Sequence, residues 1–380
     1  MLILMDCRPL QYAGPGSEKS GLIFSIVHVL AREKAVTWLF MVDHSFRPEL
    51  FPELPAASVV IRRALPGRAG WKLWYDWQLP RLAKQQGADA VMLTGGIAAA
   101  LASIPQLVWL PEKVDGRWPS IYPGRLAGSL RRAAVLFCFS DRDRVWLADR
   151  YPGTEERVFV VTAAPTEGII PLSPEEKEKI KATNTQGKEY FLADLSGAGE
   201  QEVMHLLKAF SQFKKRQHSN LQLVITGRIT GRVGLIKDRL KTYRYRQDVC
   251  WMEGADTAAP GAVTAGGGWG LMGAAYAALY LFEGSADLGV PLMNAWRAGV
   301  PVIAVNGGLL EETAGGAALG FVAGDPASLA AQLMLIYKDE NFRRGLIVKG
   351  WDRLGDFSSG RGRDTVWDGV TRAIGEPVTG

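Results

Sequence analysis

Residues 281–316 read LFEGSADLGVPLMNAWRAGVPVIAVNGGLLEETAGG, and this stretch decides the fold. Pro291 suits the first turn of a short helix, because its missing N–H needs no partner there, and Gly299 suits a left-handed helix end. Residues 300–305 form a continuously apolar run, which is typical of a strand covered on both faces. Residues 306–308 then turn the chain into a second helix. The stretch therefore predicts helix, buried strand and helix, joined by glycine turns.

Two helix N-termini in this stretch begin beside glycine turns. The first follows Gly289, and the second follows Asn306, Gly307 and Gly308. Free backbone N–H groups and the positive end of the helix dipole meet at such places. We therefore expect these turns to hold an anionic ligand such as a diphosphate.

The rest of the chain repeats a strand–helix–strand order. Apolar strands are expected at 1–6 and 36–42 around a helix at 21–32, and the order recurs after residue 189. Alternation of this kind predicts parallel sheets, and 380 residues suffice for two α/β domains. Trp71, Trp74 and Trp77 recur at helical spacing, which favours core packing over a sugar-binding platform. The glycine-rich residues 256–272 are expected to be poorly ordered without a ligand.

Composition excludes several classes of protein. A hydrophobic share of 47% and a charged share of 22% are those of a globular protein. The net charge of +5 fits an anionic ligand or an acidic membrane surface. The sequence has no basic run with interleaved aromatics, the pattern that would indicate nucleic-acid binding. The three cysteines are far apart, the four histidines show no metal-binding spacing, and no secretory signal is visible. We expect a cytoplasmic protein at the inner face of the membrane, without a metal site.

GVPLMNAWRAGVPVIAVNGGLLEETAGGAA, which begins at Gly289, resembles the donor-binding segment of group-1 glycosyltransferases of family 4. The positions that fall in register with the family pattern are Gly289, Pro291, Ala295, Gly299, Pro301, Val302, Asn306, Glu312, Ala314 and Gly315. Asp6 and Arg8 match the family's opening Asp-x-Arg. RRAAVLFCFSDRDRVWLADRY at 131–151 and FSSGRGRDTVWDGVTRAI at 357–374 extend the resemblance over nearly the whole chain.

The resemblance implies the GT-B fold, in which two Rossmann-like domains face a cleft and the C-terminal helix crosses back to the first domain. The expected boundaries are an acceptor-side domain at 1–165, a linker at 166–188, a donor-side domain at 189–350 and the returning helix at 351–380. The linker is charged and proline-bearing, as connections often are.

The resemblance also implies where ligands bind. The expected donor-binding residues are Arg228, Glu283, Gly289, Asn294, Asn306, Gly307, Gly308 and Glu312. Asn294 falls on the family's second donor glutamate. The first glutamate falls on Ala286 without a gap, or on Glu283 if three residues are inserted. On the acceptor side the resemblance points to Arg8, Gly14 and Gly16, although these two glycines could equally serve only the turn.

Two further family features are replaced. Pro111 and Glu112 stand where many members have His-Asp, and Glu200 and Gln201 stand where a basic pair grips the donor diphosphate. A carboxylate there repels a diphosphate. Arg228 and Arg232 are the obvious cationic substitutes, or they belong to a solvated loop. No catalytic nucleophile and base can be named.

The resemblance implies a hexosyltransferase of polysaccharide biosynthesis that moves a sugar, with retention, from a nucleotide sugar to a glycan or lipid-linked acceptor. The nucleotide sugar is a co-substrate, and no cofactor is expected. The replaced residues favour an alternative, a catalytically inactive homologue that acts as a binding or scaffold partner. Nucleotide-sugar epimerisation is a third hypothesis. Fold alone does not decide among them.

Overall fold

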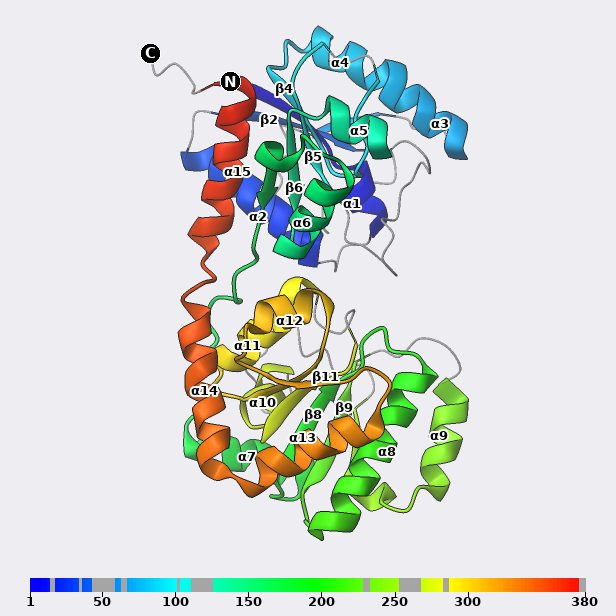
Figure 1. Cartoon of the computed structure of the whole chain (residues 1–380), viewed down its shortest axis with the longest axis vertical. Helices are drawn as coiled ribbons and strands as arrows, with labels where there is room; N and C mark the ends of the chain where they lie inside the picture. Colours follow the sequence, from blue (N-terminus) through cyan, green and yellow to red (C-terminus); the bar gives the residue numbers. More distant parts are fainter. Residues whose placement is uncertain are drawn as a thin grey trace. The chain divides into compact units, whose positions relative to one another are not determined.

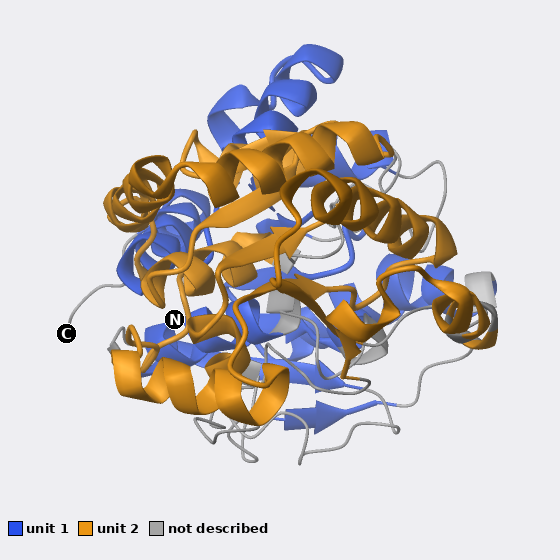
Figure 2. Ribbon diagram, turned by 90° about the horizontal axis from the view of Figure 1, so that it is seen from below, with its two compact units in different colours: residues 1–163, 359–380 blue, residues 164–358 orange. Residues whose placement is uncertain are grey.

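The computed structural model describes residues 1–13, 18–33, 36–42, 59–62, 67–100, 103–110, 126–227, 233–252, 268–282 and 287–375 (Figure 1). The chain forms two compact units, coloured separately in Figure 2. Unit 1 contains residues 1–163 and 359–380, and unit 2 contains residues 164–358. Residues 166–188, expected as a linker, are therefore part of unit 2.

Unit 1 is built on a seven-stranded parallel sheet in the order β3-β2-β1-β4-β5-β6-β7. The strands are β1 (Leu2–Asp6), β2 (Thr37–Val42), β3 (Val59–Ile61), β4 (Ala90–Leu93), β5 (Gln106–Trp109), β6 (Val135–Cys138) and β7 (Val158–Val160). The helices are α1 (Arg8–Ala13), α2 (Glu18–Glu33), α3 (Gly67–Leu73), the π-helical turn η3 (Trp74–Gln78), α4 (Leu79–Gln85), α5 (Leu126–Arg132), α6 (Asp141–Arg150), the 3₁₀ turn η4 (Glu155–Arg157) and α15 (Ser359–Ile374).

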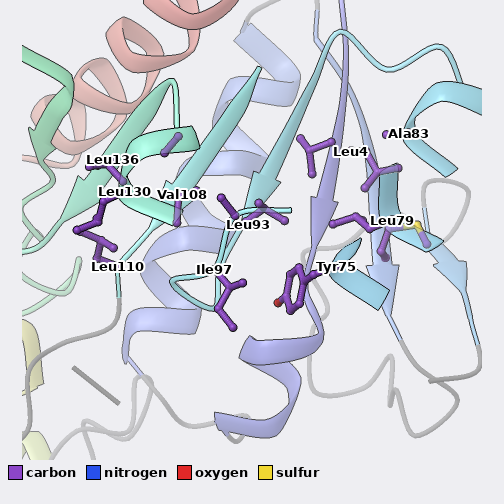
Figure 3. Close-up of a cluster of buried hydrophobic side chains, with 14 of the residues drawn as sticks. Leu4, Tyr75, Leu79, Ala83, Leu93, Ile97, Val108, Leu110, Leu130 and Leu136 are labelled. Carbon is purple, nitrogen blue, oxygen red and sulfur yellow. The ribbon is translucent and has the colours of Figure 1, made fainter. Parts of the chain in front are cut away.

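The core of unit 1 lies between this sheet and the α3–η3–α4 segment. Figure 3 shows Leu4, Leu93 and Val108 of the strands in one cluster with Tyr75 and Leu79. These side chains are almost fully buried, and burial of such side chains stabilises a fold by about 1.5–3 kcal/mol each. The apolar runs of the sequence therefore become central strands, as parallel pairing requires.

The last helix, α15, belongs to unit 1, where it packs against α2 and β6. The fit is close because two glycines face the sheet. A Cβ at Gly369 would stand 2.7 Å from the Phe137 ring, and a Cβ at Gly362 would stand 2.7 Å from the Thr162 carbonyl oxygen. The predicted return of the C-terminal helix to the first domain is confirmed.

Unit 2 is built on a six-stranded parallel sheet in the order β10-β9-β8-β11-β12-β13. Its strands are β8 (Tyr190–Asp194), β9 (Gln222–Thr226), β10 (Val249–Trp251), β11 (Ala277–Tyr280), β12 (Val302–Val305) and β13 (Leu319–Phe321). Its helices are α7 (Pro174–Thr185), α8 (Glu200–Gln217), α9 (Val233–Thr242), α10 (Gly268–Gly273), α11 (Val290–Arg297), α12 (Gly308–Ala314), α13 (Pro326–Lys338) and α14 (Glu340–Leu354), with 3₁₀ turns η5 (Arg246–Asp248) and η7 (Asp287–Gly289).

The order of these strands fixes where a ligand can bind. After β8 the chain builds outward to β9 and β10, then returns to β11 on the other side of β8 and builds outward to β12 and β13. Ligands of doubly wound sheets bind outside the carboxyl ends of the strands, near such a reversal. The loops after β8, β11 and β12 are therefore the expected place for a site.

The sequence-based prediction of two Rossmann-like parallel sheets is confirmed. The predicted helix–strand–helix stretch is also present, as α11, β12 and α12. Of residues 256–272, only 268–272 are described, where α10 begins at Gly268. The rest of that stretch lies outside the described residues. Among the described helices, none has the length and apolar character needed to cross a bilayer.

Candidate functional site

A hollow of about 420 Å³ opens at the carboxyl edge of the unit 2 sheet. It lies between the first turns of α8, the ends of β11, β12 and β13, and the start of α13. Its apolar lining includes Leu206, Leu281, Phe282, Val305, Phe321 and Leu329. Its polar lining includes Gln201, Glu202, His205, Asn306 and Asp325. An apolar floor with a few convergent polar groups is the usual composition of a small-molecule site.

Two residues singled out from the sequence meet in this hollow. Asn306, from the turn after β12, lies in its lining with Gln201, which stands where relatives are expected to carry a cation. The folding of β8 and β12 as neighbours of β11 brings these residues together from positions about a hundred residues apart in the chain. Asn306 is thus the predicted donor residue that the structure places in the hollow.

The N-terminus of the helix that begins after Asn306 is already occupied by a carboxylate of that helix. Gly307 has a φ of 112°, Gly308 has a φ of 58°, and these left-handed angles turn the chain into α12. The Gly307 N–H donates a hydrogen bond to Glu311 Oε2 at 2.9 Å. Since this N–H is one of the amides predicted to hold a diphosphate, a phosphate oxygen would have to displace the carboxylate of Glu311.

The N-terminus of α8 is capped in the same manner. The Gly199 N–H donates to Glu202 Oε2 at 2.9 Å, and the Glu202 side chain lines the hollow. Glu200, the first residue of this helix, faces Arg239 at 3.8 Å, and both side chains are exposed. An exposed pair of this kind contributes little to stability.

The charge of the hollow is therefore unlike that of a diphosphate site. Around it the described part of the chain places two carboxylates, Glu202 and Asp325, and neither lysine nor arginine. Asp325 Oδ1 accepts the Ala327 N–H at 2.8 Å and caps α13. Both carboxylates accept hydrogen bonds at helix N-termini. Among the described lining residues, no lysine or arginine is available to bind an anion.

Gly289 is needed where α11 begins. Its φ is 74°, and a Cβ there would stand 2.5 Å from Thr313 Oγ1 of α12. Both the backbone angle and the contact require glycine. The residue thus lets the turn before α11 approach α12 closely, which is the close backbone packing expected beside a ligand.

Asn294 is not among the residues that line the hollow, and it binds a distant part of the chain. It is buried, its Oδ1 accepts the Thr166 N–H at 2.8 Å, and its Nδ2 donates to Thr166 Oγ1 at 3.1 Å. Arg297 adds hydrogen bonds to the carbonyl oxygens of Ile169 at 3.1 Å and Thr166 at 3.4 Å. Asn294, at the family's second glutamate position, therefore attaches the first residues of unit 2 to α11.

The remaining predicted donor residues are placed as follows. Glu312 is half-buried on α12, and its carbonyl oxygen accepts a hydrogen bond from Arg353 Nη2 at 2.9 Å. It does not appear in the described lining of the hollow. Several positions named from the sequence lie outside the described residues: Gly14, Gly16, Pro111, Glu112, Arg228, Arg232, Glu283 and Ala286.

Arg8 lies in a buried cluster at the carboxyl end of β1. Its Nε is 3.2 Å from Asp6 Oδ1, and its guanidinium lies 3.6 Å from the centre of the Trp74 ring and 4.5 Å from that of Trp71. Trp74 Nε1 donates to Asp6 Oδ2 at 3.0 Å. The Arg8 Nη2 has no hydrogen-bond partner among the described residues. Charge, stacking and hydrogen bonds thus fix the first acceptor-side residue in one orientation.

The prediction that the three tryptophans pack in the core is confirmed for Trp74 and wrong for Trp77. Trp74 is buried, and Trp71 is half-buried against the core. Trp77, in contrast, is 54% exposed, so its assignment to the core was wrong. The reason is the π-helical turn over Trp74–Gln78, which sets both Trp74 and Tyr75 toward the core and leaves Trp77 outside.

Sequence reasoning missed the capping carboxylates. Glu202 stands three residues after Gly199, which is capping-box spacing, and Glu311 stands four residues after Gly307. Both spacings are visible in the sequence. Among the described residues, no three or more His, Cys, Asp or Glu side chains gather into a group that could hold a metal ion.

The whole chain has the fold of solved GT-B glycosyltransferases. A glycosyltransferase from Rickettsia africae superposes with a TM-score of 0.72 at 13% identity, covering 98% of both chains. Anabaena Alr3699/HepE in complex with UDP superposes with a TM-score of 0.70 at 13% identity, covering 97% of this chain and 99% of its own. WaaG, a glycosyltransferase involved in lipopolysaccharide biosynthesis, gives 0.65 at 13% identity, covering 97% and 99%.

Residues 175–351 match the family described as glycosyl transferases group 1. This range covers most of unit 2, so the donor-side half of the chain is similar to that family. No curated protein matches the chain in sequence. The resemblance of residues 289–318 to group-1 glycosyltransferases is therefore confirmed, whereas the match does not single out family 4.

Proposed function

We propose that this protein transfers a hexose from a nucleotide sugar to a glycan or lipid-linked acceptor with retention of configuration. The observation that carries the proposal is the hollow at the carboxyl edge of unit 2. It joins Gln201 and Asn306 within a domain of the group 1 glycosyl transferase family. UDP is the first nucleotide to test, because a structure of similar fold holds UDP.

Each unit contributes a separate part of this activity. On the donor side, α11 begins after Gly289, and the backbone N–H groups of its first turn can hold a phosphate without a charged side chain. On the acceptor side, Arg8 presents a fixed guanidinium in unit 1. Neither role needs a metal ion, so we propose that EDTA leaves nucleotide affinity unchanged. A fall in affinity on chelation would contradict this.

The charges around the hollow make donor binding weak. Glu202 and Glu311 occupy helix N-termini that could otherwise attract phosphate, and Glu200 replaces a cation. A charge-assisted hydrogen bond is worth about 1.5–3 kcal/mol, so two missing bonds weaken binding by a factor of roughly hundreds or more. We expect slow transfer at millimolar donor.

A second candidate function is a catalytically inactive homologue that serves as a partner of active transferases. The specific observation in its favour is Asn294, whose amide is bound to Thr166 and is not free for a donor. The acidic lining of the hollow points the same way. In this case the chain binds a nucleotide weakly or not at all and does not transfer sugar.

One experiment separates the two functions. The full chain is titrated calorimetrically with UDP, UDP-glucose and a panel of other nucleotide sugars, and UDP release is followed with candidate acceptors. Saturable binding with turnover supports the transferase. Binding without turnover for every donor and acceptor supports the inactive homologue. Low-micromolar affinity for any nucleotide sugar would overturn the expected electrostatic weakness.

We further propose that the protein works in the cytoplasm at the inner face of the membrane, where lipid-linked acceptors are held. The net charge of +5 supports this, since a basic protein is attracted to acidic lipid. Fractionation of cells in low-salt buffer tests the location. Recovery of the protein entirely outside the cytoplasm would contradict it.

A further inference from the structure

The segment α3–η3–α4 has two faces of different character. Toward the core it presents Trp74, Tyr75, Leu79 and Ala83, all buried, three of which are labelled in Figure 3. The opposite side carries Lys72, Leu73, Trp77, Arg81 and Lys84, and these five residues are called the Trp77 face. Trp77 and Arg81 lie on the same side, since the Arg81 guanidinium lies over the Trp77 ring.

The Trp77 face exposes apolar side chains between cations. Trp77 is 54% exposed and Leu73 is 38% exposed, and the side chains of Lys72, Arg81 and Lys84 are also exposed. The Arg81 guanidinium lies 5.6 Å from the centre of the Trp77 ring, which supports the ring while leaving the charge in solvent. Asp76, half-buried, is the acidic residue within the same stretch.

We propose that the Trp77 face docks unit 1 onto a bilayer surface that contains anionic lipid. A tryptophan suits the boundary between headgroups and acyl chains, because its ring is large and apolar and its N–H is polar. Leucine enters the same boundary, and lysine and arginine beside them meet lipid phosphates. Three exposed cations against one half-buried carboxylate give this face the charge opposite to that of such a membrane.

The same segment also reaches the acceptor-side cluster. On its inner side, Trp74 stacks on Arg8 at 3.6 Å and donates to Asp6 at 3.0 Å. A single helical segment therefore has the lipid-facing residues outside and the fixed Arg8 guanidinium inside. In the proposed transferase, docking would place the bilayer on the outer side of the segment whose inner side holds Arg8. This consequence rests on the proposed transferase function, whereas the docking itself does not.

Vesicle flotation of the full chain tests the docking. Without nucleotide or acceptor, we expect binding to vesicles of phosphatidylcholine with phosphatidylglycerol, little binding to phosphatidylcholine alone, and release at high salt. The double variant Arg81→Ala/Lys84→Ala is expected to weaken binding by about fivefold for each cation removed. Trp77→Ser is expected to weaken it at least as much, through loss of the interfacial ring.

Matched control variants come from unit 2. Trp351 is 47% exposed and Lys349 is exposed, both on α14, so Trp351→Ser and Lys349→Ala remove the same chemistry elsewhere. These controls are expected to bind vesicles as the parent does. Near-ultraviolet circular dichroism confirms that each variant is folded. Unchanged UDP titrations in the Trp77 face variants show that vesicle binding and donor binding are independent measurements.

Three outcomes would overturn the proposal. The first is no binding to anionic vesicles, and the second is equal loss in the α14 controls and in the Trp77 face variants. The third is sedimentation velocity showing a dimer that Trp77→Ser dissociates, which would assign the face to a second copy of the chain. A failed UDP titration would not count, because vesicle binding is measured without nucleotide.

Discussion

Asn294 and Thr166 are joined by two hydrogen bonds across 128 positions of the sequence. The backbone N–H of Thr166 donates to Asn294 Oδ1 at 2.8 Å, and Asn294 Nδ2 donates to Thr166 Oγ1 at 3.1 Å. The pair attaches the first residues of unit 2 to α11. Asn294 therefore has a structural role at the position where the family is expected to use a carboxylate.

Replacing Asn294 with alanine is expected to lower the free energy of unfolding by about 1–3 kcal/mol, because the half-buried Thr166 N–H loses its acceptor. Thr166→Val removes only the hydroxyl partner and is expected to cost less, about 0.5–1.5 kcal/mol. Urea unfolding followed by circular dichroism measures both. Asn306→Ala, at an exposed position, serves as the control. Equal losses at positions 294 and 306 would show that the Thr166 contact contributes nothing.

Gly289 and Gly316 separate two reasons for requiring glycine. Both have left-handed φ angles, 74° and 86°, but a Cβ meets Thr313 Oγ1 at 2.5 Å at Gly289 and meets nothing within 4 Å at Gly316. Gly316→Ala is expected to cost about 1 kcal/mol from backbone strain alone. Gly289→Ala is expected to cost about 1–3 kcal/mol more, since α12 must shift. Thermal unfolding of the two variants measures the difference. A smaller loss at Gly289 would refute the contact argument.

Much of the fold could be predicted because its signals are local. The apolar runs at 300–305 and 190–195, the glycine turns and the strand–helix rhythm each lie within a few residues, and parallel βαβ units have few alternative arrangements. The return of α15 was predicted only through the family resemblance. Its close packing on Phe137 depends on Gly369, more than two hundred residues away, which no local pattern indicates.

The site was harder to predict because its chemistry depends on contacts between distant residues. Nothing around Asn294 in the sequence indicates that Thr166 occupies its amide. The exposure of Trp77 depends on a π-helical turn, and periodicity of 3.6 residues places that ring in the core. The carboxylate caps Glu202 and Glu311 were readable from their spacing. The sequence interpretation treated the glycine turns only as phosphate sites, and it therefore missed these two capping carboxylates.

The buried pair of Asp6 and Arg8 is expected to be strongly coupled. Their side chains are 0% and 2% exposed, and Arg8→Met leaves the Asp6 carboxylate without its cation. We expect a loss of about 3–5 kcal/mol for Arg8→Met. The double variant Asp6→Asn/Arg8→Met is expected to lose much less than the sum of the two single variants. Chemical denaturation of all four proteins tests this. Additive losses within about 0.5 kcal/mol would exclude the coupling.

Cysteine reactivity is expected to follow burial. Burial raises the pKa of the Cys7 thiol well above its ordinary value, and the neighbouring Asp6 carboxylate raises that pKa further. Burial also raises the pKa of Cys250, which is only half-buried. A raised pKa keeps the thiol protonated and unreactive at neutral and mildly basic pH. Native alkylation mapped by mass spectrometry should modify Cys250 first, and Cys7 only in denaturant. Equal native rates would contradict this order.

Restoring two cations at the N-terminus of α8 is expected to strengthen nucleotide binding. Gln201 lines the hollow and Glu200 precedes it on the exposed first turn of α8. Glu200→Arg/Gln201→Lys is expected to tighten UDP binding by about tenfold to a hundredfold for each charge-assisted bond formed, and to make binding salt-dependent.

The control for this prediction is Glu175→Arg, which places the same charge on the exposed first turn of α7. An equal gain from this control would mean that UDP responds only to net charge and that the hollow is not the donor site. Calorimetric titration with UDP at two salt concentrations distinguishes these results. Because Asn294 remains bound to Thr166 in every variant, tighter UDP binding is expected without a matching gain in transfer. A large gain in both would show that the missing cations alone limit this protein as a transferase.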